Sequence, residues 1–371
     1  MKKALTLFAA FALGFTAFAQ SNVYFTNEIT PESLVKIYQA LGVEPTGRVA
    51  LKISTGESSQ SNYLRPEFIV DLVNLTNATI VECNTAYTGS RSNTASHLQV
   101  IAQRGFTEIA EVDIMDAEGE MEIPMQDKTH LDVDVVGSHL ANYDFMINLA
   151  HFKGHAMGGF GGVLKNQSIG VASRRGKALI HSVGENEIPE QWFYYTSDQD
   201  GFLECMAGAA QAVHNYFKQS GKDIVYINVM NNLSVDCDCD GHPAAPQMND
   251  IGILASTDPV ALDKACLDLI FNYSSTPGDN AQPLINRINQ RHGIHTVEYA
   301  EQIGLGTQEY NLIDINTTGL EEFDSQNPSP ESLRYNVFSI DGKKVLSNAT
   351  SLESLPAGVY IINGQKRVIS K

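Results

Sequence analysis

Two segments of the chain carry charges of only one sign. Residues 151–181 contain five basic side chains and no Asp or Glu, whereas the whole chain of 371 residues has a formal net charge of −18. Glycines in this segment let the backbone approach a ligand closely and offer N–H groups to an anion. The pattern predicts a pocket for a small carboxylate or phosphate; the alternative is a glycine-rich connection whose cations pair with acidic side chains elsewhere. The basic residues are Lys153, Lys165, Arg174, Arg175 and Lys177.

The basic segment also supplies candidate catalytic residues. His151 and His155 lie just beyond a predicted strand, where an imidazole could act as a general base, and a structural role is the alternative for each. Lys165 is the third candidate. The segment has no GxxxxGK[ST] motif, which excludes an ATP or GTP phosphate loop. The candidate ligands of a bound anion are Lys153, Gly161, Gly162, Asn166 and Arg174.

The acidic segment, residues 236–263, contains six Asp and no Lys or Arg. Cys237 and Cys239 are two positions apart, so in an extended backbone both thiols face the same side and could bind one soft metal ion. His242 is a possible third ligand. Two alternatives stay open, a disulfide and a pair of free thiols. Asp263 is expected on an exposed helix face.

The elements around these segments predict an α/β fold, with a mostly parallel sheet flanked by helices. Ligands of such sheets bind at the carboxyl ends of the strands, so the loops after Cys83, Leu149, Val229 and Ala255 are the places where a site is expected. Helices are predicted from Pro31, from Pro66, over 202–217 and over 259–271, and strands over 49–53, 79–83, 145–149, 224–229 and 251–255.

Residues 1–19 are predicted to be a signal peptide. Lys2 and Lys3 precede an apolar stretch, and Ala17-Phe18-Ala19 forms a small-x-small cleavage site before Gln20. The alternative is an N-terminal membrane anchor. No later segment reaches the roughly 18 apolar residues that cross a bilayer. We therefore expect an exported protein, located in the periplasm, on the cell surface or in the medium. Its acidic charge excludes a general nucleic-acid-binding surface.

The C-terminal part of the chain has a different composition. Residues 316–332 are polar and rich in turn formers, and are predicted to be a linker. Residues 333–371 predict a small all-β module with Asp-Gly and Asn-Gly turns. Its run LPAGVYII, followed by basic residues, resembles the C-terminal sorting domain of type IX secretion cargo in Bacteroidota. The resemblance implies the secretion machinery as a partner; the alternative is a structural tail.

Four motifs, in order, resemble domain of unknown function family 362 over roughly residues 45–315, and most closely its branch of uncharacterised Fe-S center proteins. The resemblance adds Thr85 and Arg91 to the candidate ligand-binding residues. Relatives in that branch often carry a cysteine-rich insert after the position of His181, but residues 181–202 contain no cysteine. A single Zn or Fe ion, or no metal, is therefore expected rather than an iron–sulfur cluster. The motifs are ECNTAYTGSRSN, HFKGHAMGGFGGVLKNQSIGVASRRGK, DCDCDGH and NDIGILASTDPVALDKA.

Three functional hypotheses follow. The first is an exported metal-binding protein in which the cysteine loop and the basic segment converge on a small anionic ligand. The second is a metal-free enzyme that acts on a carboxylated or phosphorylated small molecule, with His151 or His155 as its base. The third is a non-enzymatic secreted or surface binding protein.

Overall fold

The computed structural model describes residues 20–195, 197–316, 335–339, 343–349, 352, 354–362 and 365–369. The predicted signal peptide, residues 1–19, lies outside the described residues, as does the predicted linker apart from its first position. In the described part of the chain, no helix is both long enough and apolar enough to cross a membrane.

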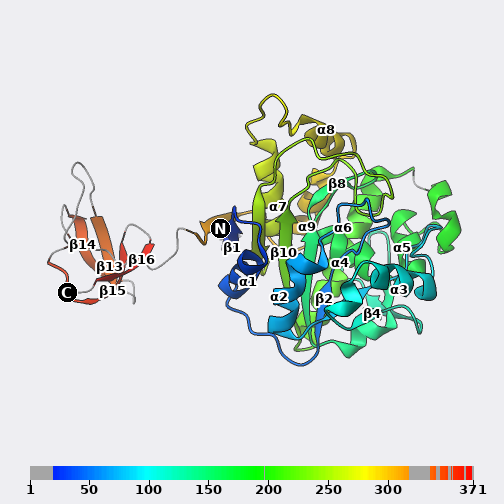
Figure 1. Cartoon of the computed structure of the whole chain (residues 1–371), viewed down its shortest axis with the longest axis horizontal. Helices are drawn as coiled ribbons and strands as arrows, with labels where there is room; N and C mark the ends of the chain where they lie inside the picture. The colour runs from blue at the N-terminus through cyan, green and yellow to red at the C-terminus, as the bar shows by residue number, and fades with distance from the viewer. Residues whose placement is uncertain are drawn as a thin grey trace, which may run out of the picture.

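An eight-stranded sheet forms the centre of the α/β domain (Figure 1). All its strands run in one direction except β11, which is antiparallel to both of its neighbours. The fold class predicted from the sequence, a mostly parallel sheet flanked by helices, is confirmed. In spatial order the strands are β12 (Tyr310–Asp314), β1 (Ser21–Thr26), β11 (Gly252–Ser256), β10 (Asp223–Met230), β7 (Phe145–His151), β2 (Val49–Lys52), β3 (Thr79–Glu82) and β4 (Val112–Ile114).

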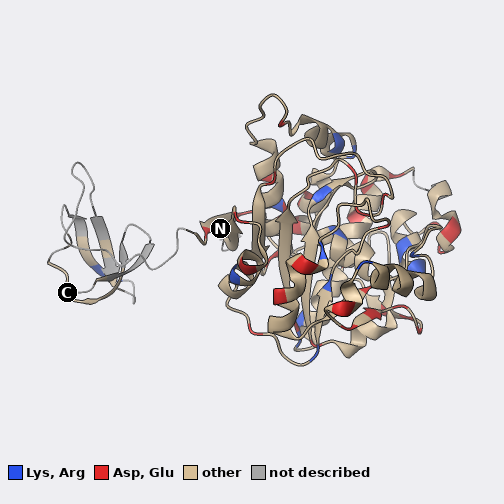
Figure 2. Ribbon diagram, viewed as in Figure 1, with Lys and Arg blue, Asp and Glu red and all other residues tan. Residues whose placement is uncertain are grey.

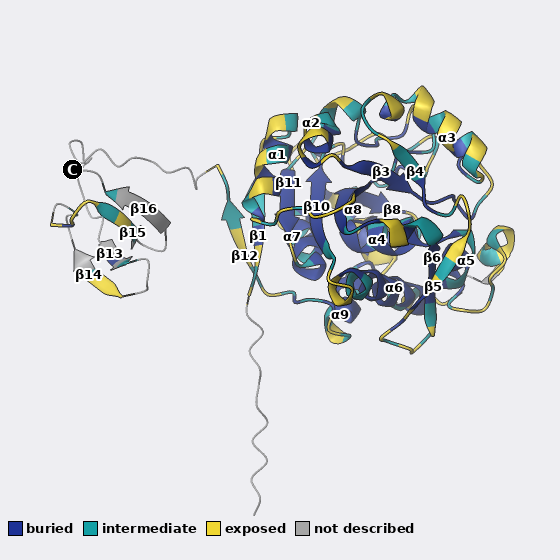
Figure 3. Cartoon of the chain, turned by 90° about the horizontal axis from the view of Figure 1, so that it is seen from below, coloured by how far each residue is buried: buried dark blue, intermediate teal, exposed yellow. Residues whose placement is uncertain are grey.

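Helices cover both faces of the sheet, whose central strands are buried, whereas the edge strand β12 is partly exposed (Figure 3). A hydrophobic core lies on each face of the sheet, and strand β10 contributes to both. Val225 and Ile227 pack into one core, whereas Ile224 and Tyr226 pack into the other, because successive side chains of a strand point to opposite faces. One face carries α1 (Pro31–Ala40), α2 (Pro66–Thr76) and α3 (Thr94–Gln103). The other carries α4 (Val163–Val171), α5 (Arg174–His181), α6 (Gln199–Gln219), α7 (Pro259–Phe271), α8 (Gln282–Gln290) and α9 (Ile294–Gln302).

The predicted helix starts follow the capping rules. Thr30 accepts a hydrogen bond from the Ser33 N–H at 3.1 Å, and Asp258 accepts one from the Val260 N–H at 2.9 Å. In both helices proline occupies the first turn, where its missing N–H costs nothing. Helix α6 begins three residues before its predicted start, because Asp198 caps it by accepting from the Gly201 N–H at 2.9 Å.

The glycine-rich basic segment folds into regular elements. Its first residues form an antiparallel hairpin of β8 (Lys153–His155) and β9 (Gly159–Gly161), and α4 and α5 follow. A second two-stranded sheet pairs β5 (Glu120–Pro124) with β6 (Val133–Gly137). Short 3-10 helices are η1 (Phe106–Glu108), η2 (Ser138–Asn142) and η3 (Pro189–Tyr195).

One expected site position is wrong. The loop after Ala255 was expected beside the others, but β11 runs antiparallel, so that its end lies at the opposite edge of the sheet. The remaining three loops share one edge. Along the chain, β3 and β4 lie on one side of β2, and β7 and β10 on the other. Such a reversal of strand order leaves a crevice at the carboxyl ends of the strands, here between β2 and β7.

Near the C-terminus, four short strands form a separate antiparallel sheet in the order β14-β13-β15-β16. Val337 and Leu355 form its small buried core. The strands are β13 (Tyr335–Ser339), β14 (Lys344–Ala349), β15 (Gly358–Ile362) and β16 (Gln365–Ile369).

Candidate functional site

A cavity of about 240 Å³ lies at the carboxyl ends of the central strands. Lys52 borders it at the end of β2, Cys83 just after β3 and Ala150 near the end of β7. The basic and the acidic segments both contribute to its wall. From the basic segment come Lys153, His155, Gly161, Gly162, Lys165, Asn166, Lys177 and His181, and from the acidic segment come Cys237, Asp238 and Cys239.

A close backbone contact holds the hairpin of the basic segment against the residues that immediately precede the acidic segment. The Gly154 N–H, in the hairpin, donates to the carbonyl of Ser234 at 2.8 Å. A Cβ at Gly154 would lie only 2.3 Å from the carbonyl oxygen of Val235, so that a side chain at this position would push the segments apart. Glycine here thus brings the hairpin against the cysteine loop.

Buried ion pairs join the basic segment to the acidic segment. Lys153 Nζ lies 2.8 Å from Asp238 Oδ2, and His151 Nδ1 lies 3.0 Å from Asp238 Oδ1. Burial opposes ionisation of Asp238, but the charges of Lys153 and His151 outweigh it and hold the pKa of Asp238 well below its usual value. The other ring nitrogen of His151 lies 2.6 Å from the carbonyl oxygen of Asn231. Both nitrogens of His151 are therefore occupied, and His151 does not line the cavity.

A second buried ion pair fixes the opposite wall. Arg91 lies 3.4 Å from Glu82 and 3.0 Å from Glu57. His97 Nε2 lies 2.9 Å from the second Glu82 oxygen. Burial raises the pKa of Glu82, but the hydrogen bond from His97 and the charge of Arg91 outweigh this effect and keep the carboxyl ionised.

The lining of the cavity is rich in positive charge. Five of its residues are Lys or Arg and only two, Glu82 and Asp238, are acidic. Elsewhere along the ribbon, acidic and basic positions are interspersed (Figure 2). The cavity is thus a positive region within a protein of net charge −18. The five basic residues are Lys52, Arg91, Lys153, Lys165 and Lys177.

Lys165 is the lining cation without a partner. Its ammonium makes no hydrogen bond or ion pair with any residue that the structure describes, whereas Lys153 and Arg91 are held by carboxylates. Burial lowers the pKa of Lys165 to about 7, and the charges of Lys153 and Lys52 act in the same direction. An ammonium of this kind is available to a bound anion.

Lys52 also lines the cavity, and it was not among the site residues predicted from the sequence. Its ammonium donates to the Ile53 carbonyl at 2.7 Å and to Asn166 Oδ1 at 3.1 Å. Burial lowers the pKa of Lys52 to about 8, although the charge of Glu82 opposes the shift. The sequence did indicate that Lys52 is unusual. A lysine within an otherwise apolar strand is rarely buried unless it has a polar partner.

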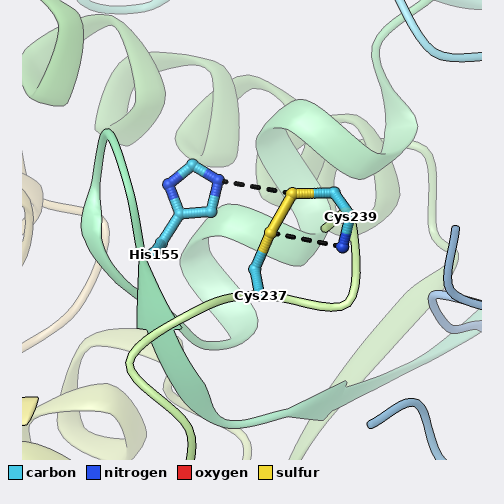
Figure 4. A group of neighbouring side chains, drawn as sticks. All are labelled: His155, Cys237 and Cys239. Atoms are coloured by element: carbon cyan, nitrogen blue, oxygen red, sulfur yellow. Dashed lines mark hydrogen bonds between the residues drawn. A yellow bond between two sulfur atoms is a disulfide. The ribbon is translucent and has the colours of Figure 1, made fainter. Parts of the chain in front are cut away.

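His155 faces the cysteine loop from the β8–β9 hairpin (Figure 4). Its Nδ1 accepts hydrogen bonds from the N–H groups of Met157 at 3.2 Å and Gly158 at 2.8 Å. A neutral imidazole has one acceptor and one donor nitrogen, so the ring proton lies on Nε2. Nε2 is 3.9 Å from the sulfur of Cys239. Burial and the charge of Lys165 keep the pKa of His155 well below its usual value, so the ring is neutral.

Cys237 and Cys239 form a disulfide. Together with a ring nitrogen of His155, their sulfur atoms form a group of potential ligands that lie within 4.8 Å of one another and could bind a metal ion. His242, the third ligand expected from the sequence, is exposed and lies outside this group. The hairpin supplies a histidine instead.

Two features of this group do not fit a metal ion as the site stands. Metal ligands are thiolates, whereas the two sulfur atoms are joined to each other. A ligating imidazole needs a free lone pair, whereas Nε2 of His155 carries the ring proton. Metal binding therefore requires reduction of the disulfide and loss of that proton.

The remaining predicted ligands divide into two groups. Thr85, Gly161, Gly162 and Asn166 line the cavity together with Arg91 and Lys153. Arg174 does not: it donates to the Thr85 carbonyl at 3.0 Å and pairs with Glu190, and so supports the wall from outside.

Asp263 is not exposed, contrary to expectation. It is fully buried and accepts hydrogen bonds from the N–H groups of Val163 and Leu164, both at 3.0 Å. These N–H groups lie in the first turn of α4, so Asp263 satisfies donors at the start of this helix that have no partner within it. Burial raises the pKa of Asp263 to about 6.

The fold and the cavity define an α/β protein with a basic cavity at the carboxyl edge of its sheet. The chain belongs to the family described as Domain of unknown function (DUF362), whose model matches residues 49–268. No curated protein matches the sequence significantly.

Two solved structures resemble the chain. One is the lactate racemase apoprotein from Thermoanaerobacterium thermosaccharolyticum, at 15% identity and a TM-score of 0.36, with 71% of this chain and 59% of that chain covered. The other is a structural-genomics target from Thermotoga maritima, at 10% identity and a TM-score of 0.40, with 75% and 59% covered. The chain thus spans about three fifths of the length of each.

Proposed function

We propose that the protein binds a small molecule bearing a carboxylate or a phosphate in the basic cavity, with Lys165 as the charge partner of that group. The observation that carries the proposal is the unpartnered ammonium of Lys165 among four other cations. The Lys165 side chain is partly buried, so its ammonium is only partly hydrated, and a bound anion would supply the partner that it lacks among the described residues. The volume of about 240 Å³ suits a small ligand.

The same lysine supports an enzymatic role. With a pKa of about 7, part of the Lys165 population in the free protein is neutral near pH 7, and this neutral form, which does not pair with an anion, can accept a proton from a substrate in the cavity. His155 is a weaker candidate for this step, because both of its ring nitrogens face neighbours within the protein. Lys165 is therefore the general base that we favour.

Isothermal titration calorimetry with phosphate and with malonate tests the proposal. Substitution Lys165→Met keeps the length of the side chain and removes its charge, and should weaken binding at least tenfold, about 1.4 kcal/mol. Lys36→Met is the matched control, since Lys36 is exposed on α1 and pairs with Glu32. Binding that is equal in the wild type and the Lys165 variant would refute the proposal.

Metal binding is a second candidate function, and the grouping of His155, Cys237 and Cys239 favours it. Metal binding is expected only after the disulfide between Cys237 and Cys239 has been reduced. Protein reduced under anaerobic conditions should take up about one equivalent of Zn²⁺, and Cys237→Ser should abolish uptake. A four-thiolate iron–sulfur cluster is disfavoured, since the other cysteines, Cys83, Cys205 and Cys266, are buried outside this group.

We further propose that the protein is exported and that its C-terminal strands act in sorting. The proposal rests on the leader sequence before Gln20 and on the LPAGVYII run. N-terminal sequencing of the native protein should begin near Gln20. Deletion of residues 333–371 should change its location; an unchanged location would count against the sorting role.

A further inference from the structure

We propose that Cys237 and Cys239 exchange their disulfide with a dithiol, and that His155 positions the proton that stabilises one of the released thiolates. This activity is independent of anion binding by Lys165. Three observations carry it: the small size of the disulfide loop, the N–H donor beside each sulfur, and the access to the pair from two sides.

The disulfide contributes little to the stability of the fold. Its cysteines are separated by Asp238 alone. A cross-link stabilises a fold mainly by restricting the unfolded chain, and this effect increases with the length of the closed loop. The loop here is close to the shortest possible one, so that a chemical role accounts for the pair better than a structural role.

Each sulfur has an N–H donor beside it. The backbone N–H of Cys239 donates to the sulfur of Cys237 at 3.2 Å. The Nε2–H of His155 faces the sulfur of Cys239 at 3.9 Å, and two backbone N–H groups fix that tautomer from the other side of the ring. A thiolate is a stronger acceptor than a disulfide sulfur, so both contacts favour the reduced products.

The disulfide borders two spaces. Cys237 and Cys239 line the basic cavity, and they also line an outer hollow of about 350 Å³. Cys237 is buried, whereas Cys239 is partly exposed. An incoming thiolate therefore reaches the sulfur of Cys239 first. The hollow is further lined by Glu57, Tyr87, Thr88, Ala156, Asp236, Asp240 and Gly241.

The exchange proceeds in two balanced steps. One thiolate of the dithiol attacks Cys239 Sγ, the bond between Cys237 and Cys239 breaks, and Cys237 leaves as a thiolate that accepts the Cys239 N–H. The second thiolate of the dithiol then attacks its own sulfur in the mixed disulfide, which releases the Cys239 thiolate toward His155 Nε2–H. The dithiol loses two electrons and releases its two protons to the solvent, and the cysteine pair takes up the two electrons as two thiolates.

Reduction by dithiothreitol at pH 7, followed by alkylation and mass spectrometry, tests the inference. Air-purified folded protein should contain the disulfide and should gain two reactive thiols, since Cys83, Cys205 and Cys266 are buried. His155→Leu, which lacks the N–H donor, should slow the second step, the release of Cys239 from its mixed disulfide with dithiothreitol, at least tenfold. His155→Gln, which offers an amide N–H, should restore part of the rate, and a purely structural role would not separate these two variants.

His295→Leu is the matched control, because His295 is partly exposed on α9 and lies outside the cavity lining. It should be reduced at the wild-type rate. Equal rates in the wild type and in His155→Leu would overturn the proposal. The proposal would also be overturned if Cys237 and Cys239 were both free thiols in air-purified wild-type protein. This measurement does not depend on whether the variants fold.

Discussion

The ammonium of Lys153 lies 2.8 Å from the carboxylate of Asp238, and both groups are buried. This ion pair joins the basic segment to the acidic one at the edge of the sheet. It also separates the roles of the cations: Lys153 is neutralised within the protein, whereas Lys165 is left for a ligand. The site thus depends on which of its charged side chains have partners within the protein.

Loss of the Asp238 carboxylate should destabilise the fold. Asp238→Asn leaves Lys153 buried without a counter-charge and also weakens the contact with His151. Removal of one member of a buried pair costs about 3–5 kcal/mol in the free energy of unfolding. Urea denaturation measures it, with Asp240→Asn, at an exposed position of the same loop, as the control. A loss no larger than in the control would show that the pair is not needed.

Anion affinity should fall as the pH rises. Only the protonated form of Lys165 attracts an anion, and its pKa in the free protein is about 7. Above pH 7 the dissociation constant of malonate, whose own charge is constant there, should increase about tenfold per pH unit. Calorimetry at pH 7, 8 and 9 measures this slope. A constant affinity over that range would mean that Lys165 does not bind the anion.

Asp134 in β6 should make stability depend on pH. Burial raises the pKa of Asp134 to about 7, so that the folded state holds its proton more tightly than the unfolded state does. Its contribution to stability is complete below the unfolded pKa of about 3.9 and is lost as the pH rises through about 7. Asp134→Asn cannot ionise. Relative to the wild type it should gain stability in urea between pH 5 and pH 8, whereas exposed Asp132→Asn should not.

Two neighbouring glycines should respond differently to alanine. A Cβ at Gly162 would lie 2.3 Å from Asp263 Oδ1, whereas a Cβ at Gly161 would meet only Lys165 Cδ and Lys153 Cε, at 3.6 and 3.7 Å. Gly162→Ala should therefore lower the free energy of unfolding by about 1–3 kcal/mol, as overpacking does, and Gly161→Ala should change it little. Thermal unfolding compares them. Equal losses would mean that the backbone at Gly162 moves away from Asp263 at no cost.

The α/β class could be predicted because apolar strands such as 145–149 alternate with capped, amphipathic helices such as the one after Thr30. The direction of β11 could not be predicted from the sequence, since a buried strand is apolar whether it runs parallel or antiparallel to its neighbours. The sequence also could not show that His155, rather than the nearer His242, lies beside the cysteines. That contact depends on how the hairpin packs on the cysteine loop, which spacing along the chain does not encode.

The burial of Asp263 could not be predicted from the sequence either. A single carboxylate on an apolar helix is compatible with an exposed face or with a buried cap, and only the position of α4 decides between them. Lys52 was recognisable in principle, as a charge within an apolar strand. The sequence therefore predicts which segments carry the site, and tertiary packing determines which of their charges remain unpartnered.

The most direct test of the central claim is anomalous diffraction from crystals grown with selenate, a heavy analogue of a small oxyanion. An anion held by Lys165 should give a selenium peak inside the cavity with an oxygen about 3 Å from Lys165 Nζ, and the peak should disappear in Lys165→Met. A wild-type cavity without a selenium peak, or a peak that is unchanged in the variant, would contradict the assignment of Lys165 as the anion-binding residue.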